Sequence, residues 1–207
     1  GRQTGTVGKF NAISFNGNKI ITSSGGGLFV SDDEEAVKKV RFYSTQARDP
    51  APWYQHSEIG YNYRMSNVVA GIGRGQLLHL DEHKALKTAI YQRYKEAFAD
   101  MPVEMNPYLS CSEPNFWLSC ITIDKKMYEK VTPEKIRLAL EAENIESRPI
   151  WKPMHMQPVY KGYDYITADD NVGEDIFARG LCLPSDIKMT DAQQQRVIDV
   201  VKGCFDV

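Results

Sequence analysis

The sequence predicts an α/β protein in which short strands and a long helix precede a smaller α+β region. Three observations on the 207 residues support this prediction. Short apolar, β-like segments lie between residues 10 and 30, and a long helical pattern covers residues 66–99. Beyond Pro102, strand-like and helix-like segments alternate. Strands interspersed with helices are typical of α/β and α+β architectures.

The first predicted elements are two strands, at residues 10–15 and 27–30, with Lys19 and a run of three glycines between them. Ser31 is expected to open a helix that continues to about Tyr43. Its hydroxyl can accept a capping hydrogen bond, and the acidic residues after it favour the positive end of the helix dipole. The following stretch is rich in proline and aromatic residues and predicts a long loop, a kind of segment that is often functional.

Ser66 is expected to cap a helix that continues to about Leu80. After a break near Asp81, a second helical pattern runs to about Ala99. Apolar residues at helical spacing share one face of this second segment: Ile90, Tyr94, Ala97 and Phe98. Glycines 71, 73 and 75 near the start of the first helix predict close packing, in which we expect a dimer contact.

The C-terminal part predicts strands at residues 115–123, 145–148 and 181–184. Thr132 and Pro133 indicate the start of a helix that ends at Asn144. Thr190 and Gln193 indicate a capping box at the start of the last helix. An apolar stripe is expected on that helix: Val197, Val200, Val201, Cys204 and Phe205.

Composition excludes several classes of function. The chain is 42% hydrophobic and 25% charged, with a net charge of -2, which is typical of soluble globular proteins. No apolar run approaches the roughly 18 residues of a membrane span, and no basic stripe predicts nucleic-acid binding. The four cysteines lack zinc-site spacing, and His79 and His83 lack a nearby carboxylate arrangement typical of a metal triad, so no metal site is expected. Reduced thiols in a cytoplasmic protein are the better interpretation.

Lys19 is the candidate reactive residue. A lysine amine has a pKa of about 10.4 in water and needs a desolvated or cationic setting before it can form an imine. From the local spacing alone, a surface lysine in a glycine-rich loop is the more ordinary interpretation.

Four segments in order resemble the DegT/StrS-type sugar aminotransferases, which depend on pyridoxal 5'-phosphate. They are residues 14–27 (SFNGNKIITSSGGG), 42–48 (FYSTQAR), 60–66 (GYNYRMS) and 148–155 (RPIWKPMH). Ser24-Gly25-Gly26-Gly27 stands where the family usually has Gly-Glu-Gly-Gly. The last two segments most resemble members that aminate a UDP-linked 4-keto-6-deoxy-N-acetylhexosamine.

The resemblance implies the C-terminal part of a pyridoxal-phosphate-dependent transferase fold. Residues 1–80 would be a remnant of the large cofactor-binding domain, residues 81–100 a linking helix, and residues 101–207 a small α+β domain. Relatives are nearly twice as long, and the chain starts with neither an initiator methionine nor a signal peptide. We therefore expect a C-terminal fragment that lacks the aspartate partner of the pyridine nitrogen.

The resemblance also implies roles for individual residues. Lys19 would hold the cofactor as a Schiff base and move the proton during transfer, and Ser14 would donate to the cofactor phosphate. Asn62 and Arg64 would reach the phosphate of the neighbouring subunit's cofactor in a homodimer. Ser14 as a solvent-facing strand serine and Arg64 as an internal salt-bridge residue are the alternatives.

Substrate choice would depend on the last segment. Arg148 is expected to pair with the diphosphate of a sugar nucleotide, Trp151 to stack or pack against it, and His155 to hydrogen-bond a sugar oxygen. A surface charge, a core tryptophan and an ordinary loop histidine are the respective alternatives.

The resulting hypothesis is a cytoplasmic transaminase that moves an amino group from an amino acid, expected to be glutamate, to a 4-keto-6-deoxy sugar nucleotide. Its product would serve surface polysaccharide or glycoprotein synthesis. A regulatory or ligand-sensing protein that retains the fold without turnover is the alternative, although related non-transaminases replace the lysine. A third hypothesis is a cofactor-free remnant that associates through exposed apolar surface.

Overall fold

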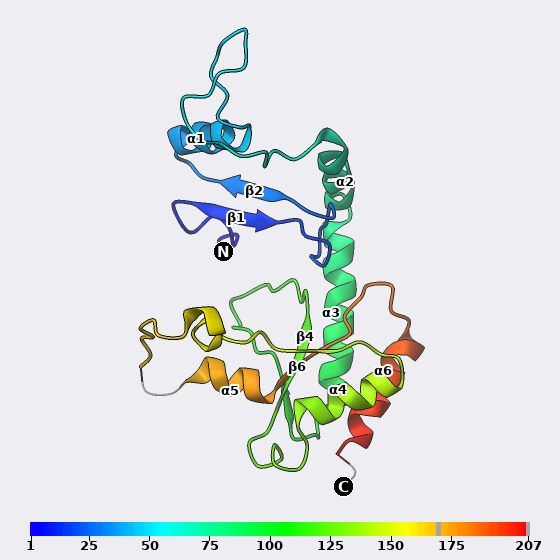
Figure 1. Ribbon diagram of the computed structural model, residues 1–207. Helices are drawn as coiled ribbons and strands as arrows, with labels where there is room; N and C mark the ends of the chain where they lie inside the picture. Colours follow the sequence, from blue (N-terminus) through cyan, green and yellow to red (C-terminus); the bar gives the residue numbers. More distant parts are fainter. Residues whose placement is uncertain (169–170, 206–207) are drawn as a thin grey trace. The chain divides into compact units, whose positions relative to one another are not determined.

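The computed structural model describes residues 1–168 and 171–205 (Figure 1). Its internal contacts divide the chain into two units, Gly1–Glu82 and His83–Val207. The boundary between the units falls within helix α3 (Leu80–Ala97).

The first unit contains a two-stranded antiparallel sheet. Strands β1 (Asn11–Ser14) and β2 (Gly27–Val30) pair with Asn11 opposite Val30 and Ser14 opposite Gly27. Helix α1 (Glu34–Ser44) contacts β2, as Figure 1 shows. Both predicted strands are confirmed, and the chain between them forms the loop that carries Lys19.

The predicted N-cap of α1 at Ser31 is wrong, because Asp33 has that position. The Asp33 carboxylate accepts a hydrogen bond from the Ala36 N–H at 3.0 Å, and this bond lowers the pKa of Asp33. The Ser31 hydroxyl instead donates to the Lys9 carbonyl at 2.7 Å and accepts from the Asp33 N–H at 3.1 Å. Aspartate caps as well as serine does, and its charge also suits the helix dipole.

Helix α2 (Asn67–Leu77) is capped by Ser66, as predicted, with the Val69 N–H donating to the Ser66 hydroxyl at 3.3 Å. Helix α2 ends at Leu77, three residues before its predicted end near Leu80. Helix α3 begins at Leu80. Among the described residues, none of the glycines expected to pack closely requires the absence of a side chain: a Cβ at Gly73 would lie 3.7 Å from the Ser23 Cβ, an ordinary contact distance, and a Cβ at Gly71 or Gly75 would meet nothing within 4 Å. Helix α2 therefore packs against the lysine loop.

The second unit has a four-stranded antiparallel sheet in the order β3-β4-β6-β5. Its strands are β3 (Val103–Met105), β4 (Ser119–Ile123), β5 (Arg148–Pro149) and β6 (Gly180–Leu183). Its further helices are α4 (Pro133–Ala142), α5 (Val172–Arg179), α6 (Asp191–Gly203) and the 3₁₀ turns η1 (Met154–Met156) and η2 (Pro158–Tyr160).

Several predicted boundaries in this unit are wrong. The strand expected from residue 115 begins only at Ser119, because Phe116 adopts a φ of 46°, outside the extended range. The strand expected at residues 145–148 is reduced to Arg148–Pro149, since the chain turns at Asn144 with a φ of 57° before it extends. Strand β3 and helix α5 were not predicted as elements.

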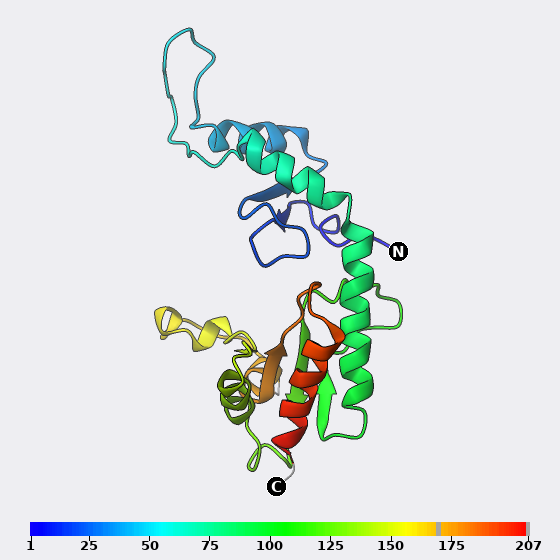
Figure 2. The same cartoon turned by 90° about the vertical axis from the view of Figure 1, so that its right-hand side faces the viewer.

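The core of the second unit lies between helices α3, α4 and α6 and strands β4 and β6. Its fully or nearly fully buried members include Ile90, Tyr94, Phe98, Ile121, Ile123, Ile136, Leu140, Leu181, Leu183, Val197, Ile198 and Val201. The predicted face of α3 and the predicted stripe of α6 are confirmed, with Ala97, Val200 and Phe205 partly buried at the edge. Figure 2 shows α6 beside the part of α3 that belongs to this unit.

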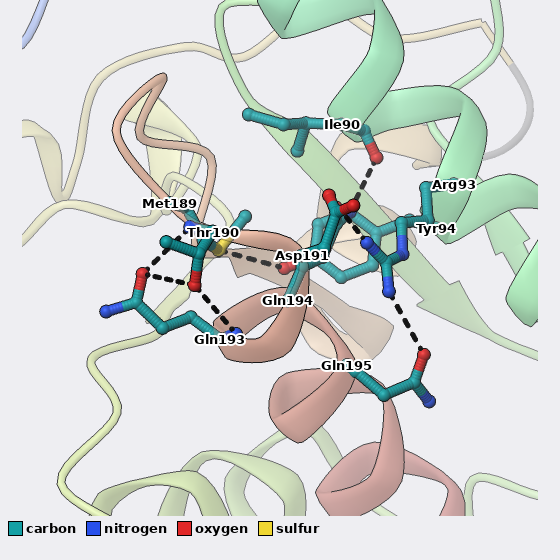
Figure 3. Close-up of polar contacts among 9 residues, drawn as sticks. All are labelled: Ile90, Arg93, Tyr94, Met189, Thr190, Asp191, Gln193, Gln194 and Gln195. Atoms are coloured by element: carbon teal, nitrogen blue, oxygen red, sulfur yellow. Dashed lines mark hydrogen bonds and ion pairs between the residues drawn. The ribbon is translucent and has the colours of Figure 1, made fainter.

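Polar contacts fix the start of α6 against α3 (Figure 3). The capping box between Thr190 and Gln193 is confirmed. The amide of Gln194, only 3% exposed, donates to the Ile90 carbonyl at 2.8 Å, and Arg93 pairs with Asp191 at 2.8 Å. A buried amide with a backbone partner fixes the position of one helix on the other.

Candidate functional site

Lys19 lies in a closed loop that connects β1 to β2. The Phe15 N–H donates to the Gly26 carbonyl at 3.0 Å, and the Ser23 N–H donates back to the Phe15 carbonyl at 3.1 Å. Within this loop the Lys19 N–H donates to the Asn16 carbonyl at 3.0 Å, which closes a four-residue turn. Lys19 itself is half-buried. The sheet register therefore holds the loop, and the turn positions the lysine within it.

The glycine run allows the two sides of the hairpin to close. A Cβ at Gly27 would lie 2.4 Å from the Ile13 carbonyl oxygen, and one at Gly26, where φ is 85°, would lie 2.6 Å from the Met65 Cε. Ser24 has a φ of 72°, in the left-handed region that glycine adopts freely. A serine there costs roughly 1 kcal/mol of strain, which explains why glycine suits this position.

A groove of about 570 Å³ in the first unit brings two predicted site residues together. Ser14, at the end of β1, and Arg64 both line it, although they are far apart in the sequence. Tyr43, Tyr61 and Tyr63 are among its other lining residues. Lys19 and Asn62 are not among them. The groove thus offers a hydroxyl and a guanidinium, two donors suited to an anionic group.

The segment that carries Asn62 and Arg64 is fastened to the end of α1. Asn62 forms an isolated antiparallel bridge with Thr45. The N–H groups of Tyr63 and Arg64 both donate to the Ser44 carbonyl at 3.0 Å, and the Tyr61 N–H donates to the Tyr43 carbonyl at 2.7 Å. These backbone hydrogen bonds fix the position of the backbone at Arg64, from which its side chain extends.

Gly60 allows its own chain segment to lie close to the backbone of Gln46 and Ala47. A Cβ at Gly60 would lie 2.2 Å from the Ala47 nitrogen and 2.3 Å from the Gln46 carbonyl carbon. Gln46 and Ala47 both have positive φ, at 70° and 50°. Ala47 is fully buried. A turn that is already constrained therefore packs directly against the glycine.

Sequence reasoning missed Glu58, which connects the long loop to α1. The Lys39 ammonium lies 2.6 Å from one Glu58 oxygen, and the Tyr43 hydroxyl donates to the other at 2.7 Å. The Lys39 contact lowers the pKa of Glu58, and Glu58 in turn raises the pKa of Lys39. No spacing rule connects residues so far apart in sequence, so no signal in the chain identified the pair.

Three residues are expected to recognise the substrate: Arg148, Trp151 and His155. The contacts described for each of them are with other residues of the chain. The Arg148 guanidinium donates twice to one oxygen of Glu146, at 2.8 and 2.5 Å. Trp151 is 61% exposed, and its ring centroid lies 5.8 Å from that of Trp117.

His155 belongs to a polar cluster. Its Nε2 atom lies 2.7 Å from a Glu174 oxygen, and its ring stacks on Tyr165 with centroids 3.6 Å apart. The Tyr165 hydroxyl donates to the Asn171 side-chain oxygen at 3.2 Å, and the Asn171 amide nitrogen donates to Glu174. His155 is thus held by its neighbours, and Glu174 is a partner that the sequence did not reveal.

Residues 1–168 and 171–205 contain no group of three or more acidic, histidine or cysteine side chains arranged to hold a metal. Within the same residues no helix is both long enough and apolar enough to cross a bilayer.

The sequence profile of the DegT/DnrJ/EryC1/StrS aminotransferase family matches residues 1–202. The chain belongs to this family. The predicted family and fold class are therefore confirmed.

Relatives within the DegT/DnrJ/EryC1/StrS family include EpsN of Bacillus subtilis (strain 168), named as a candidate pyridoxal phosphate-dependent aminotransferase. It is 47% identical over 99% of this chain and 53% of its own length. The GDP-perosamine synthase of Caulobacter vibrioides is 32% identical over 96% of this chain and 53% of its own length. The chain spans about half the length of the curated relatives it matches.

The fold is also that of a solved structure in this class of protein. The chain aligns with the pyridoxal-phosphate form of Spr1654, a candidate sugar aminotransferase from Streptococcus pneumoniae, with a TM-score of 0.85 and 21% identity. The alignment covers 99% of this chain and 53% of Spr1654. The fold of this chain therefore corresponds to about half of a longer known fold.

Proposed function

We propose that this protein is a pyridoxal-phosphate-dependent sugar aminotransferase. Its donor would be an amino acid, glutamate in our proposal, and its acceptor a 4-keto-6-deoxy sugar linked to a nucleoside diphosphate. The amino sugar would enter surface polysaccharide or glycoprotein synthesis. The observation that carries the proposal is the match of the family profile to residues 1–202, within which Lys19 occupies a loop closed by glycines.

The chemistry of the residues present fits the cofactor. A phosphate that carries close to two negative charges needs several hydrogen-bond donors, and Ser14 offers one of them, a hydroxyl at the wall of the groove. An aldehyde needs a primary amine for covalent attachment, and Lys19 supplies one in the adjoining loop. The name of EpsN supports the same cofactor.

Each residue has a defined task in this proposal. Bound pyridoxal phosphate supplies an electron sink for the carbon atom that loses a proton. The Lys19 amine would hold the cofactor covalently, and once free it would serve as the general base that accepts a proton from the donor α-carbon. Ser14 would donate its hydroxyl to the cofactor phosphate and so help to hold the cofactor in place.

We propose a homodimer in which Asn62 and Arg64 contact the cofactor phosphate of the partner subunit. Large apolar side chains of the first unit are strongly exposed, which supports association. They include Ile59 at 85%, Tyr63 at 77%, Val68 at 75% and Leu78 at 86% exposure. We assign the enzyme to the cytoplasm, because its four cysteines are free.

The substrate side of the proposal rests on Arg148, Trp151 and His155. The Arg148 guanidinium side chain is 78% exposed and paired only with the neighbouring Glu146 among the contacts described for it. Exposed ion pairs contribute about 0–1 kcal/mol, so a sugar-nucleotide diphosphate can replace Glu146. The GDP-perosamine synthase relative supports a nucleotide-linked sugar as the substrate class.

The test uses a protein of the relatives' full length, with Lys19→Arg compared with Lys38→Arg in the exposed part of α1. We expect the imine absorbance band and amination of a 4-keto sugar nucleotide in the wild type and in Lys38→Arg, and neither in Lys19→Arg. Cofactor and sugar-nucleotide binding without amination in the wild type would contradict the transaminase and favour the ligand-sensing alternative.

A further inference from the structure

Two cysteines lie opposite each other on adjacent strands of the second unit. Cys120 in β4 pairs with Cys182 in β6, and their sulfur atoms are 3.5 Å apart. Both are free thiols; Cys182 is 7% exposed and Cys120 is half-buried. The aminotransferase proposal assigns neither of them a role.

The backbone hydrogen bonds of Cys120 define the type of strand pair. Its N–H donates to the side-chain oxygen of Asn106 at 2.8 Å, and its carbonyl accepts from the Asn106 N–H at 2.9 Å. Asn106 directly follows β3, so both groups point to that side and away from β6. Residues in such a non-hydrogen-bonded antiparallel pair have Cα atoms about 4.5 Å apart. That separation lies within the range of about 4.4–6.8 Å that a disulfide spans.

The hydrogen bond between the sulfurs makes the two thiols unequal. The Cys120 thiol donates to the Cys182 sulfur, and this bond lowers the pKa of Cys182 while it raises the pKa of Cys120. The thiolate is the nucleophile in disulfide exchange, so the lowered pKa makes Cys182 the more reactive member of the pair.

We propose that Cys120 and Cys182 form a redox-active dithiol that closes to a disulfide on exposure to a low-molecular-weight disulfide such as oxidised glutathione. One protein thiolate attacks a sulfur of the oxidant and releases the first glutathione thiolate. The second protein thiolate attacks the protein sulfur of the mixed disulfide and releases the second glutathione. Two protein thiols are oxidised, the S–S bond of the oxidant is reduced, and the two protons end on the released glutathiones.

The disulfide would join β4 to β6, next to the strand that holds Arg148. Cys182 is opposite Cys120 in the pairing of β4 with β6 and opposite Arg148 in the pairing of β5 with β6. The inference concerns the thiol pair itself and stands independently of the aminotransferase proposal.

The experiment exposes the 207-residue chain, without air, to a series of glutathione buffers of rising oxidised fraction. Free thiols are then alkylated and counted by intact mass, and linked peptides are mapped. We expect the wild type to lose two alkylatable thiols together, with a peptide that joins Cys120 to Cys182, and to regain both after dithiothreitol. The midpoint temperature of thermal unfolding should be about 5 °C or more higher for the oxidised form than for the reduced form, because the cross-link restricts the unfolded chain.

The exposed Cys111 provides the matched control. Cys111→Ser should still lose two thiols, whereas Cys120→Ala should lose none to an internal disulfide. Circular dichroism confirms that each variant is folded, and Cys182→Ala replaces Cys120→Ala if that variant is not. Four alkylatable thiols in the oxidised wild type, a mixed disulfide that never resolves, or a bond that involves Cys111 or Cys204 would overturn the inference.

Discussion

The same substitution, glycine to alanine, should have opposite effects at two positions of the first unit. At Gly60 an added Cβ would lie 2.2 Å from the Ala47 nitrogen and 2.3 Å from the Gln46 carbonyl carbon. At Gly75, in helix α2, it would meet nothing within 4 Å. Backbone atoms cannot rotate out of the way as side-chain ends can, so Gly60→Ala must separate two chain segments.

The expected loss of stability in Gly60→Ala follows from the hydrogen bonds that the separation of the two segments would disturb. The Gln46 N–H donates to the Tyr61 carbonyl at 2.9 Å, next to Gly60, and the Ala47 N–H donates to the Phe42 carbonyl at 2.9 Å. Overpacking costs about 1–3 kcal/mol and a weakened hydrogen bond about 1 kcal/mol. We therefore expect Gly60→Ala to destabilise the unit by about 2–4 kcal/mol. Gly75→Ala should stabilise it by about 0.5–1 kcal/mol through helix propensity.

Urea unfolding followed by tryptophan fluorescence measures both effects. Trp53 reports on the first unit in a background that carries Trp117→Phe and Trp151→Phe in the second. The predicted result is a lower midpoint for Gly60→Ala and a higher one for Gly75→Ala. Equal shifts in the two variants, or a stabilised Gly60→Ala, would refute the packing argument.

Two further predictions concern the second unit. Tyr94→Phe removes the hydroxyl that donates to the Pro184 carbonyl at 3.0 Å, and should cost about 1 kcal/mol in urea unfolding; a cost near zero would show that water or another donor replaces it. Lys87 donates to the Trp117 carbonyl at 3.2 Å, and burial lowers its pKa. The unfolded chain therefore binds the Lys87 proton more tightly, and stability should rise with pH between the lowered pKa and the ordinary value of 10.5. Lys87→Met should lose this rise and Lys84→Met should keep it; an unchanged pH slope in Lys87→Met would contradict the assignment.

Helix starts could be predicted from the sequence because their signals are local. Ser66, Thr132 and the Thr190 capping box all act within three residues of themselves. Ser31 misled the prediction because its hydroxyl is engaged by the distant Lys9 carbonyl, a contact that no local pattern reveals. Strand β3 was missed because a three-residue edge strand is too short to show alternation.

The candidate site was predictable only in its parts. Ser14 and Arg64 were both identified from short segments, but their meeting in one groove depends on the β1–β2 pairing and on the backbone bonds of Tyr63 and Arg64 to Ser44. Glu174 was missed as a partner of His155 because α5 was not predicted. Sequence therefore identifies reactive side chains, and tertiary structure decides their partners.

The central claim is that the Lys19 amine holds the cofactor. Borohydride reduction of a full-length protein loaded with pyridoxal phosphate, followed by peptide mapping, tests it most directly, because reduction makes the lysine–cofactor bond permanent. A pyridoxyl group is expected on the peptide that contains Lys19. Attachment at a different lysine, or none at all in a protein that still aminates its sugar nucleotide, would contradict it.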